Sequence, residues 1–185
     1  MIQATYIAFT VFFLSLLLGF GTVPSEPPSE LAVVPRVEID RYLGTWYEIA
    51  RYPNRFQKEC VAVTADYSLR PDGKIKVVNA CRKETLDGKI KKIEGKAWVA
   101  DKATNAKLKV QFFWPFWGAY WIIDLGEDYE FAVVGHPKRK YLWILSRTPT
   151  LDQETLDGIL ARLPDKGYDT ERLQWTLQAV RENPE

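Results

Sequence analysis

The chain has 185 residues, enough for one sizeable domain or at most two small ones. Its 25 basic and 24 acidic side chains almost cancel, which argues against a nucleic-acid partner, and a hydrophobic content of 46% excludes a disordered chain. One His and two Cys are too few for a zinc cluster, so we expect no metal site, whereas 7 Trp, 9 Tyr and 9 Phe exceed what a core of this size usually needs.

The N-terminal segment is apolar and has no charged side chain before Glu26. Residues 7–18 and the following Gly19-Phe20-Gly21 resemble the hydrophobic part and cleavage site of a signal peptide. Residues 1–21 are therefore predicted to be a signal peptide or, alternatively, an uncleaved membrane anchor. We expect export to the periplasm or to a membrane-associated site at the cell envelope, without lipidation of this segment, because it contains no Cys. The Pro- and Ser-rich residues 22–35 are predicted to be a linker.

Residues 36–180 are predicted to form one domain that consists mainly of strands. The clearest alternation of apolar and polar side chains covers residues 61–69 and resumes at Ile75, after the turn Pro71-Asp72-Gly73. Eight short strands joined by hairpin-length loops favour an all-β fold, an up-and-down antiparallel β-barrel, because closure removes exposed sheet edges. The expected strands are residues 45–52, 61–69, a run from Ile75, 93–100, 107–113, 119–125, 129–135 and 141–147.

The hydrophobic period changes after Pro149. Thr150 or Asp152 can cap a helix that continues to about Leu163, in which apolar side chains recur at the 3.6-residue spacing of one helix face. Pro164 and Gly167 would end it. We expect this one C-terminal α-helix to pack on the outside of the barrel, and residues 173–177 either to add a strand or to pack on the barrel wall.

Three short motifs occur in order along these strands. Gly44-Thr45-Trp46 opens the first strand, Asp128-Tyr129 precedes the seventh and Arg147 ends the eighth. The chain thereby resembles the lipocalin family, whose second motif usually has Thr where Glu127 stands here. Residues 42–51 and 141–149 are similar to the bacterial outer-membrane lipocalins and their apolipoprotein D-like relatives. The resemblance implies an eight-stranded barrel for lipophilic ligands, followed by a helix, with structural roles for Gly44, Trp46, Asp128, Tyr129 and Arg147.

Trp46 would close one end of the barrel, and Arg147 would lie over its ring in a cation–π contact. Cys60 and Cys81 are predicted to form a disulfide, because an exported chain meets an oxidising environment. The bond would close a loop of about 20 residues and stabilise the fold by roughly 3 kcal/mol. Two buried free thiols are the alternative.

An eight-stranded barrel has an interior wide enough for one small ligand. Alternate residues of a strand face the same side, so strand parity predicts which side chains line this cavity. Trp114 is added from the neighbouring loop. The predicted ligand-binding residues are Ala50, Tyr52, Val63, Ala65, Tyr67, Phe112, Trp114, Tyr120, Phe131, Tyr141 and Trp143.

The loops after strands one, three, five and seven are expected to surround the open end, since successive hairpins alternate ends. These mouth loops are residues 53–59, 83–89, 114–117 and 135–140. Aromatic residues 112–117 are suited to a ligand or a membrane–water interface, or else pack inward as a lid. Lys138, Arg139 and Lys140 are suited to a lipid headgroup or an anionic surface, or else form a solvated turn.

We expect a protein that stores or transports fatty acids or lysophospholipids at the cell envelope, in membrane maintenance or stress response. Its predicted partners are a lipid or other small hydrophobic ligand and a membrane surface; the chain is expected to be a monomer or weak homodimer without a cofactor. It is expected not to be an enzyme; the alternatives are an isomerase or de-epoxidase, using His136 or a free Cys, and a carrier of a pigment or haem-like cofactor.

Overall fold

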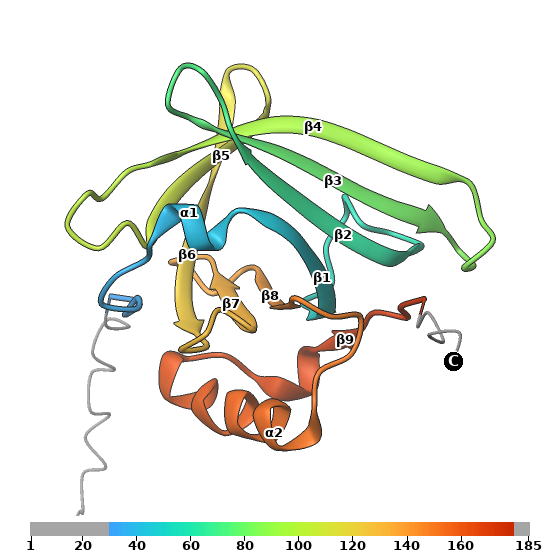
Figure 1. Ribbon diagram of the computed structural model, residues 1–185. Coiled ribbons are helices and arrows are strands. Elements are labelled where there is room, and N and C mark those ends of the chain that lie inside the picture. The colour runs from blue at the N-terminus through green and yellow to red at the C-terminus, as the bar shows by residue number, and fades with distance from the viewer. Residues whose placement is uncertain (1–29, 180–185) are drawn as a thin grey trace, which may run out of the picture.

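The computed structural model describes residues 30–179, so the predicted signal segment lies outside the described residues. Eight antiparallel strands follow one another around a barrel, which closes because β1 pairs with both β2 and β8 (Figure 1). The predicted barrel with one C-terminal helix is confirmed. The strands are β1 (Gly44–Arg51), β2 (Cys60–Leu69), β3 (Ile75–Lys83), β4 (Ile90–Val99), β5 (Lys107–Phe113), β6 (Phe116–Leu125), β7 (Phe131–Gly135) and β8 (Leu142–Ser146).

The barrel interior is filled from one face of every strand. Inward side chains of β1, β3, β5 and β6 include Trp46, Val77, Leu108 and Ile122, all buried in a single hydrophobic cluster. This alternation is the period-2 pattern of a strand with one face buried. The interior is therefore apolar over most of its depth.

One end of the barrel is closed by the short helix α1 (Ile39–Tyr42) and Trp46. The Trp46 side chain is fully buried, and its Nε1 donates a hydrogen bond to the Tyr42 carbonyl over 2.8 Å. The Arg147 guanidinium lies 3.8 Å from the centre of the Trp46 ring and donates to the carbonyls of Arg41 and Thr45. This is the contact that the motif resemblance implies. Gly44 has φ +92°, a backbone conformation that favours glycine, and an added Cβ would lie only 3.4 Å from the Arg147 guanidinium. Glycine therefore suits both the backbone angle and the close approach of Arg147.

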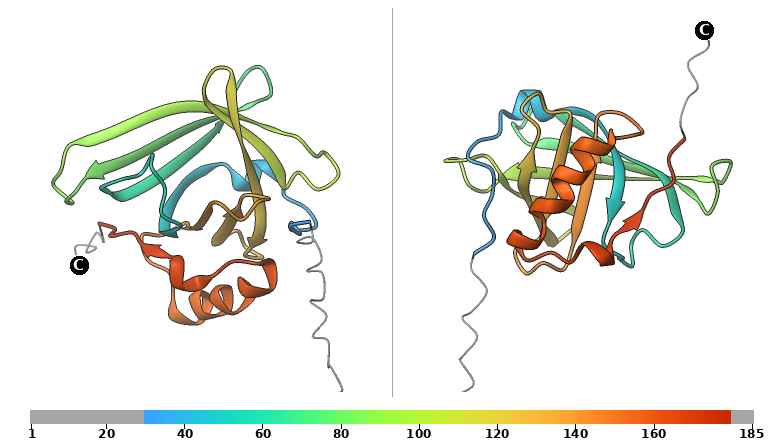
Figure 2. Two further views of the ribbon diagram at one scale, coloured as in Figure 1. Left: turned by 180° about the vertical axis from the view of Figure 1, so that it is seen from behind. Right: turned by 90° about the horizontal axis from the view of Figure 1, so that it is seen from below.

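The helix α2 (Gln153–Arg162) packs across the outer face of the barrel, as the view from below shows (Figure 2). The Asp152 carboxylate caps it by accepting a hydrogen bond from the Thr155 amide over 2.9 Å. Two 3₁₀ turns, η1 (Pro164–Lys166) and η2 (Thr170–Arg172), lead from α2 back to the barrel. A second cluster lies between α2 and the wall and includes Leu31, Ala50, Tyr52, Ile123, Phe131, Val133, Leu142, Ile144, Ile159, Leu163 and Tyr168.

The short strand β9 (Gln174–Trp175) extends the wall beside β1. The pairing of β1 with β2 covers only Gly44–Tyr47, whereas nearer the mouth β1 pairs at Ala50 and Arg51 with β9. The chain after β9 bridges the resulting gap, since the Thr176 amide donates to Ile49 and the Ala62 amide donates to Leu177. Of the two alternatives for residues 173–177, the strand is the one that forms.

The described end of the predicted linker, residues 30–35, packs on the barrel. Leu31 is buried in the outer cluster, and the Val34 amide donates to the Ile122 carbonyl over 3.1 Å. Residues 30–35 thus lie against the barrel with Leu31 removed from water, while the Pro- and Ser-rich residues 24–29 of the predicted linker lie outside the described residues.

Candidate ligand-binding site

Several predicted lining residues face the barrel interior. Tyr67 belongs to the interior cluster, and four others pack against it: Ala65, Phe112, Tyr120 and Trp143. Val63 lies near the mouth, where it packs against the two half-cystines. The parity prediction is therefore right about which side of the wall these residues occupy, while their contact with a ligand stays a prediction.

Three predicted lining residues face the opposite side, and for them the prediction is wrong. Ala50, Tyr52 and Phe131 pack beneath α2 in the outer cluster. The register of β1 shifts between Glu48 and Ala50, which reverses the alternation of inward and outward side chains, so that Ala50 and Tyr52 face outward. In β7 every residue is buried, so hydrophobicity cannot identify the inner face, and Ala132 and Val134 are the ones that face inward.

Three tyrosine hydroxyls meet inside the barrel near its closed end. Tyr120 is hydrogen-bonded to Tyr42 over 2.8 Å and to Tyr67 over 2.9 Å. Burial raises the pKa of all three hydroxyls, to about 12 for Tyr67, so all three are neutral at ordinary pH. The group satisfies its own polar atoms and leaves the ring faces as apolar wall.

The disulfide joins Cys60 of β2 to Cys81 of β3, with 5.5 Å between their Cα atoms. The prediction of this bond is confirmed. Asn79 precedes Cys81 by two residues and so lies on the same side of β3, and its Oδ1 is buried without a hydrogen-bond partner among the described residues. This inward acceptor, which the sequence analysis missed, can accept a hydrogen bond from a hydroxyl-bearing ligand.

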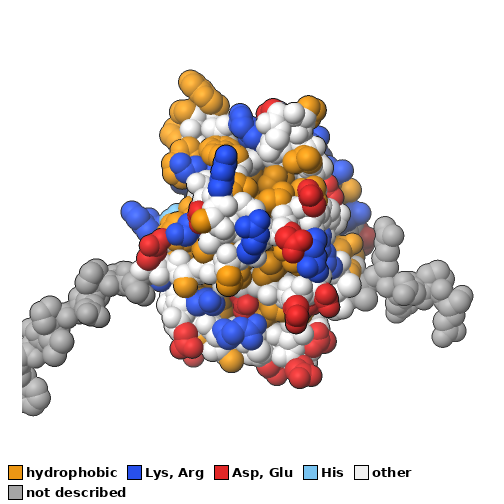
Figure 3. Space-filling view, turned by 60° about the vertical axis from the view of Figure 1, so that its left-hand side comes forward, with side chains coloured by type: hydrophobic (Ala, Val, Ile, Leu, Met, Phe, Trp, Pro, Cys, Tyr) orange, Lys and Arg blue, Asp and Glu red, His pale blue; other side chains and the backbone are white. Residues whose placement is uncertain are grey.

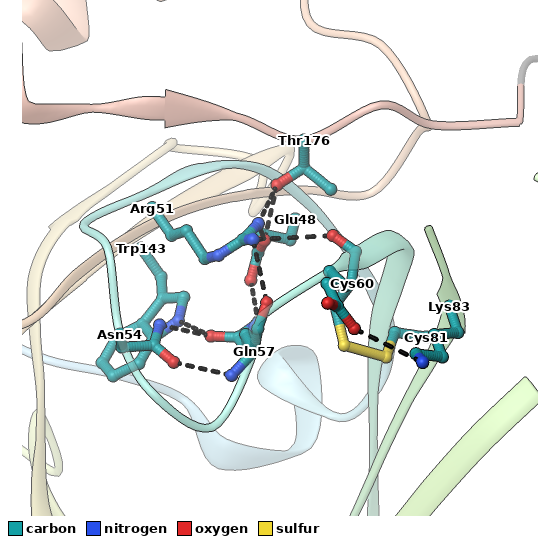
Figure 4. The surroundings of a disulfide bond; sticks show 10 residues. Glu48, Arg51, Asn54, Gln57, Cys60, Cys81, Lys83, Trp143 and Thr176 are labelled. Carbon is teal, nitrogen blue, oxygen red and sulfur yellow. Dashed lines mark hydrogen bonds and ion pairs between the residues drawn. A yellow bond between two sulfur atoms is a disulfide. The ribbon is translucent and has the colours of Figure 1, made fainter. Parts of the chain in front are cut away.

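A buried polar network lies at the mouth beside the disulfide (Figure 4). The Arg51 guanidinium donates to the Glu48 carboxylate over 2.7 Å and to the Thr176 hydroxyl over 2.9 Å. Gln57 donates to Glu48 over 2.6 Å and accepts from the Trp143 indole over 2.9 Å. This network was not predicted from the sequence, although charged residues at strand positions with a buried pattern are a signal for it. It places polar atoms at the mouth, above the apolar interior.

A hollow of about 490 Å³ opens next to this network under the β1–β2 loop. Its wall includes Arg51, Asn54, Arg55, Lys58 and Gln174. Amide and cationic groups of this kind can hold the polar end of an amphiphile.

The tip of the β5–β6 hairpin carries four exposed aromatic side chains, here called the aromatic tip. Their exposed fractions are 68% for Phe113, 84% for Trp114, 76% for Phe116 and 53% for Trp117. An inward-packed lid is therefore wrong for these four residues. Trp114 therefore lies exposed at the rim and does not face the barrel interior in this structure.

Tyr141 immediately precedes β8, and its ring stacks on Trp143 with 5.8 Å between centroids. It also contacts the ring of Phe56, which is 60% exposed on the β1–β2 loop. Tyr141 therefore connects the interior wall to the rim and is only partly buried.

The basic β7–β8 loop divides into two kinds of side chain. Lys138 and Lys140 are exposed, whereas Arg139 donates to the carbonyls of Lys166 and Pro137 and so ties the loop to η1. His136 accepts a hydrogen bond from the Lys138 amide through Nδ1, as a turn residue does. Burial and then the nearby Lys140 and Lys138 lower the pKa of His136.

Two features are absent from the described residues: a metal-binding cluster and a membrane-spanning helix. Residues 30–179 contain no group of three or more His, Cys, Asp or Glu side chains placed to hold a metal ion. Within the same residues, no helix is both long and apolar enough to cross a membrane.

Comparison with known proteins gives a consistent result. A family model described as a lipocalin-like domain matches residues 37–178. Outer membrane lipoprotein Blc of Escherichia coli (strain K12) is 45% identical over 152 residues, which cover 82% of this chain and 85% of that protein. Apolipoprotein D of Macaca fascicularis is 36% identical over 149 residues, covering 75% and 76%.

A solved structure shows the same fold at lower sequence identity. Insecticyanin from the tobacco hornworm Manduca sexta superposes with a TM-score of 0.65 at 20% identity, covering 83% of this chain and 86% of that one. At this identity the likeness concerns the fold alone.

Proposed function

The chain belongs to the lipocalin family, and from this premise we propose that it binds a single-chain lipophilic molecule, a fatty acid or lysophospholipid, inside the barrel. We propose further that it stores or transports this molecule at the cell envelope, in membrane maintenance or stress response. The polar end of the ligand would lie at the mouth and its hydrocarbon chain within.

One observation carries the proposal: inward apolar and aromatic side chains line the interior, while a polar network lies at the mouth. This distribution matches an amphiphile that enters chain first. A chain of about 14 methylenes, at about 0.8 kcal/mol each, offers about 11 kcal/mol of gross burial. Association and ordering cost several kcal/mol, which leaves micromolar to nanomolar affinity with little selectivity for chain length.

Location at the envelope is supported by the names of two relatives, which describe Escherichia coli and Vibrio cholerae Blc as outer membrane lipoproteins. For this chain we propose export by residues 1–21, as a cleaved signal or an anchor, ahead of one domain over residues 36–180. Both cysteines of the chain are in the disulfide, so we propose that membrane association does not use an N-terminal lipid. We propose a monomer or weak homodimer.

Binding is favoured over catalysis because the side chains that could act as catalytic base or nucleophile are engaged in other bonds. The Nδ1 atom of His136 accepts a backbone hydrogen bond in a turn, and Cys60 and Cys81 are bonded to each other. We propose that the protein is not an enzyme. Thiol titration of the unreduced protein tests this, since two reactive thiols would restore the alternative of a Cys nucleophile.

Adjacent residues of β5 provide the test of ligand binding. Phe112 packs toward the interior, whereas Gln111 is its neighbour in the strand and lies on the opposite face. Phe112→Asp would place a carboxylate in the apolar path of the chain, and Gln111→Asp would place it outside.

We expect titration with lysophosphatidylcholine, followed by tryptophan fluorescence, to give saturable binding for the parent protein and for Gln111→Asp. Phe112→Asp should bind at least about tenfold more weakly, because an unpaired charge disfavours the apolar interior. Both variants are checked for folding by circular dichroism. Equal binding by the two variants, or no saturable change in the parent, would refute binding in the barrel.

A further inference from the structure

The β5–β6 hairpin projects beyond the strands on either side of it. Pairing of β4 with β5 ends at Gln111, and pairing of β6 with β7 ends at Trp121. The residues between them pair only with each other, up to Phe113 opposite Phe116. The aromatic tip is therefore held clear of the barrel on a two-stranded arm, visible at the top of Figure 1.

The four side chains of the aromatic tip remain accessible to water, with exposed fractions of 53–84%. Single exposed apolar side chains are ordinary on a protein surface, but a cluster of four large ones indicates an interaction site. Trp is also the side chain that partitions best into the boundary between lipid and water.

Charge is distributed unevenly between the two ends of the barrel. The four mouth loops, residues 53–59, 83–89, 114–117 and 135–140, carry seven Lys and Arg against three Asp and Glu. The four connections at the closed end carry four Lys and Arg against six Asp and Glu. These connections are residues 70–74, 100–106, 126–130 and 147–152. The mouth is thus the positive end of a molecule whose total charge is close to neutral.

Lys109 lies behind the aromatic tip on the outer face of the hairpin, with its ammonium 3.9 Å from the centre of the Trp117 ring. Lys107 lies farther from the tip, at the closed-end start of β5, where it forms an ion pair with Glu30. Lys138 borders the same outer hollow of about 410 Å³. Figure 3 shows hydrophobic side chains gathered at the upper end of this face, with Lys and Arg side chains beside them.

We propose that the mouth end docks on an anionic lipid bilayer, with the aromatic tip inserted among the lipids and the flanking lysines at the level of the phosphates. The membrane association itself rests on the proposed function. The new elements are the negative charge of the lipid, the insertion of the aromatic tip and the orientation of the mouth toward the bilayer. The mouth then faces the bilayer, so an amphiphile can pass between membrane and barrel chain first. Like charge around the mouth disfavours a second copy of this chain as the occupant of this surface.

The test is sedimentation of the purified protein with vesicles of phosphatidylcholine alone and of phosphatidylcholine mixed with phosphatidylglycerol. We expect binding to the mixed vesicles, weakened by added salt, and at least about tenfold weaker binding to phosphatidylcholine alone. Bilayer lipids brominated in their acyl chains should quench tryptophan fluorescence in the bound protein. Equal binding to both vesicles, or no binding to either, would overturn the proposal.

Matched variants separate the two parts of the surface. Trp114→Ala/Phe116→Ala removes tip side chains, and its control Leu69→Ala removes an apolar side chain exposed at the closed end. Lys138→Glu/Lys140→Glu reverses two mouth charges, and its control Lys74→Glu/Lys102→Glu reverses two at the closed end. We expect about tenfold or greater loss for each mouth variant and little change for each control.

Ligand binding is measured on the same variants with lysophosphatidylcholine below its micellar concentration. We expect the tip variant to lose vesicle binding and to keep ligand binding, which distinguishes failure of docking from failure of the proposed function. A tip-dependent dimer in analytical ultracentrifugation, without vesicle binding, would instead identify a second copy as the occupant and overturn docking on lipid.

Discussion

Arg147 makes more contacts than the cation–π pair implied by its motif. Besides stacking on Trp46, its guanidinium donates to the carbonyls of Arg41, Thr45 and Tyr129, which belong to three segments of the closed end. One side chain thus holds α1, β1 and the turn before β7 together.

We predict that Arg147→Ala lowers the free energy of unfolding by about 2–3 kcal/mol, because it loses the ring contact and several charged hydrogen bonds. Arg147→Lys should recover little, since an ammonium cannot reproduce the planar fork. Urea unfolding measures both. The control is Arg70→Ala, whose guanidinium pairs on the surface with Asp72; its cost should stay below about 1 kcal/mol. Equal costs for Arg147→Ala and Arg70→Ala would contradict this account of the closed end.

The interior tyrosines make stability depend on alkaline pH. Burial raises the folded-state pKa of Tyr67 to about 12 and that of Tyr42 and Tyr120 above its ordinary value, whereas in the unfolded chain each titrates near 10. The unfolded state therefore binds fewer protons between these values. The stability due to these groups is fully present below pH about 10 and falls as pH rises toward about 12.

We predict that urea midpoints decline over this window and that phenolate absorbance shows exposed tyrosines titrating before the buried ones. Tyr120→Phe should lower stability at neutral pH by about 1–3 kcal/mol, because it leaves the hydroxyls of Tyr42 and Tyr67 without their shared partner. An unchanged midpoint up to pH about 12 would show that these hydroxyls ionise equally in both states.

At the residue scale, sequence parity succeeds wherever only one face of a strand is buried. The predicted inward placement of Tyr67 and Phe112 is correct because polar residues alternate with apolar ones in β2 and β5. Tyr120 also faces inward, although its strand β6 is apolar on both faces. Ala50 and Phe131 were misplaced because a bulge reverses β1 and because α2 buries the outer face of β7. Neither cause is visible in the hydrophobic pattern of a single strand.

At the scale of elements, β1, the β1–β2 loop and β9 meet in the network around Glu48 and Arg51. Both side chains are buried, and they join β1 to Gln57 of the loop and to Thr176 beyond β9. Gln178 adds hydrogen bonds to the carbonyls of Glu48 and Val63, across the gap between β1 and β2. The network therefore fastens the C-terminal segment into the wall where two strands separate.

We predict that Arg51→Met lowers the free energy of unfolding by about 3–5 kcal/mol, because it leaves the Glu48 carboxylate buried without its cation. The double variant Glu48→Leu/Arg51→Met should be less damaging, since it removes both charges and fills the volume. Urea unfolding compares them. If the double variant costs as much as the sum of the two single variants, the pair is not coupled as described.

Strands with turn residues between them were predictable, and so was the cap of α2 at Asp152. The short helix α1 was not, because four residues carry too little periodicity. The prediction of a loop over residues 114–117 is wrong for Phe116 and Trp117, which belong to β6, since the hairpin turns on Trp114-Pro115 alone. Glu48 and Arg51, at buried positions of β1, were the only sequence signal of the polar network, because Thr176 is 125 residues from Arg51 and its part in the network depends on the fold.

For the whole molecule, sequence and structure agree on a barrel that is closed at one end and has a polar, positively charged mouth. Most aromatic side chains of the described residues lie in three places: around Trp46 at the closed end, along the interior wall and at the aromatic tip. We propose that the barrel interior binds a hydrocarbon chain and that the charged rim meets a membrane. Binding of the chain inside the barrel is the central claim.

The most direct test of that claim is a titration with a fatty acid brominated along its chain, followed by tryptophan fluorescence. Trp143 packs against the interior cluster near the mouth, whereas Trp175 is exposed on β9. We predict quenching that saturates at one ligand per protein, is reduced in Trp143→Phe and is preserved in Trp175→Phe. Quenching that fails to saturate, or that Trp143→Phe leaves unchanged, would contradict binding inside the barrel.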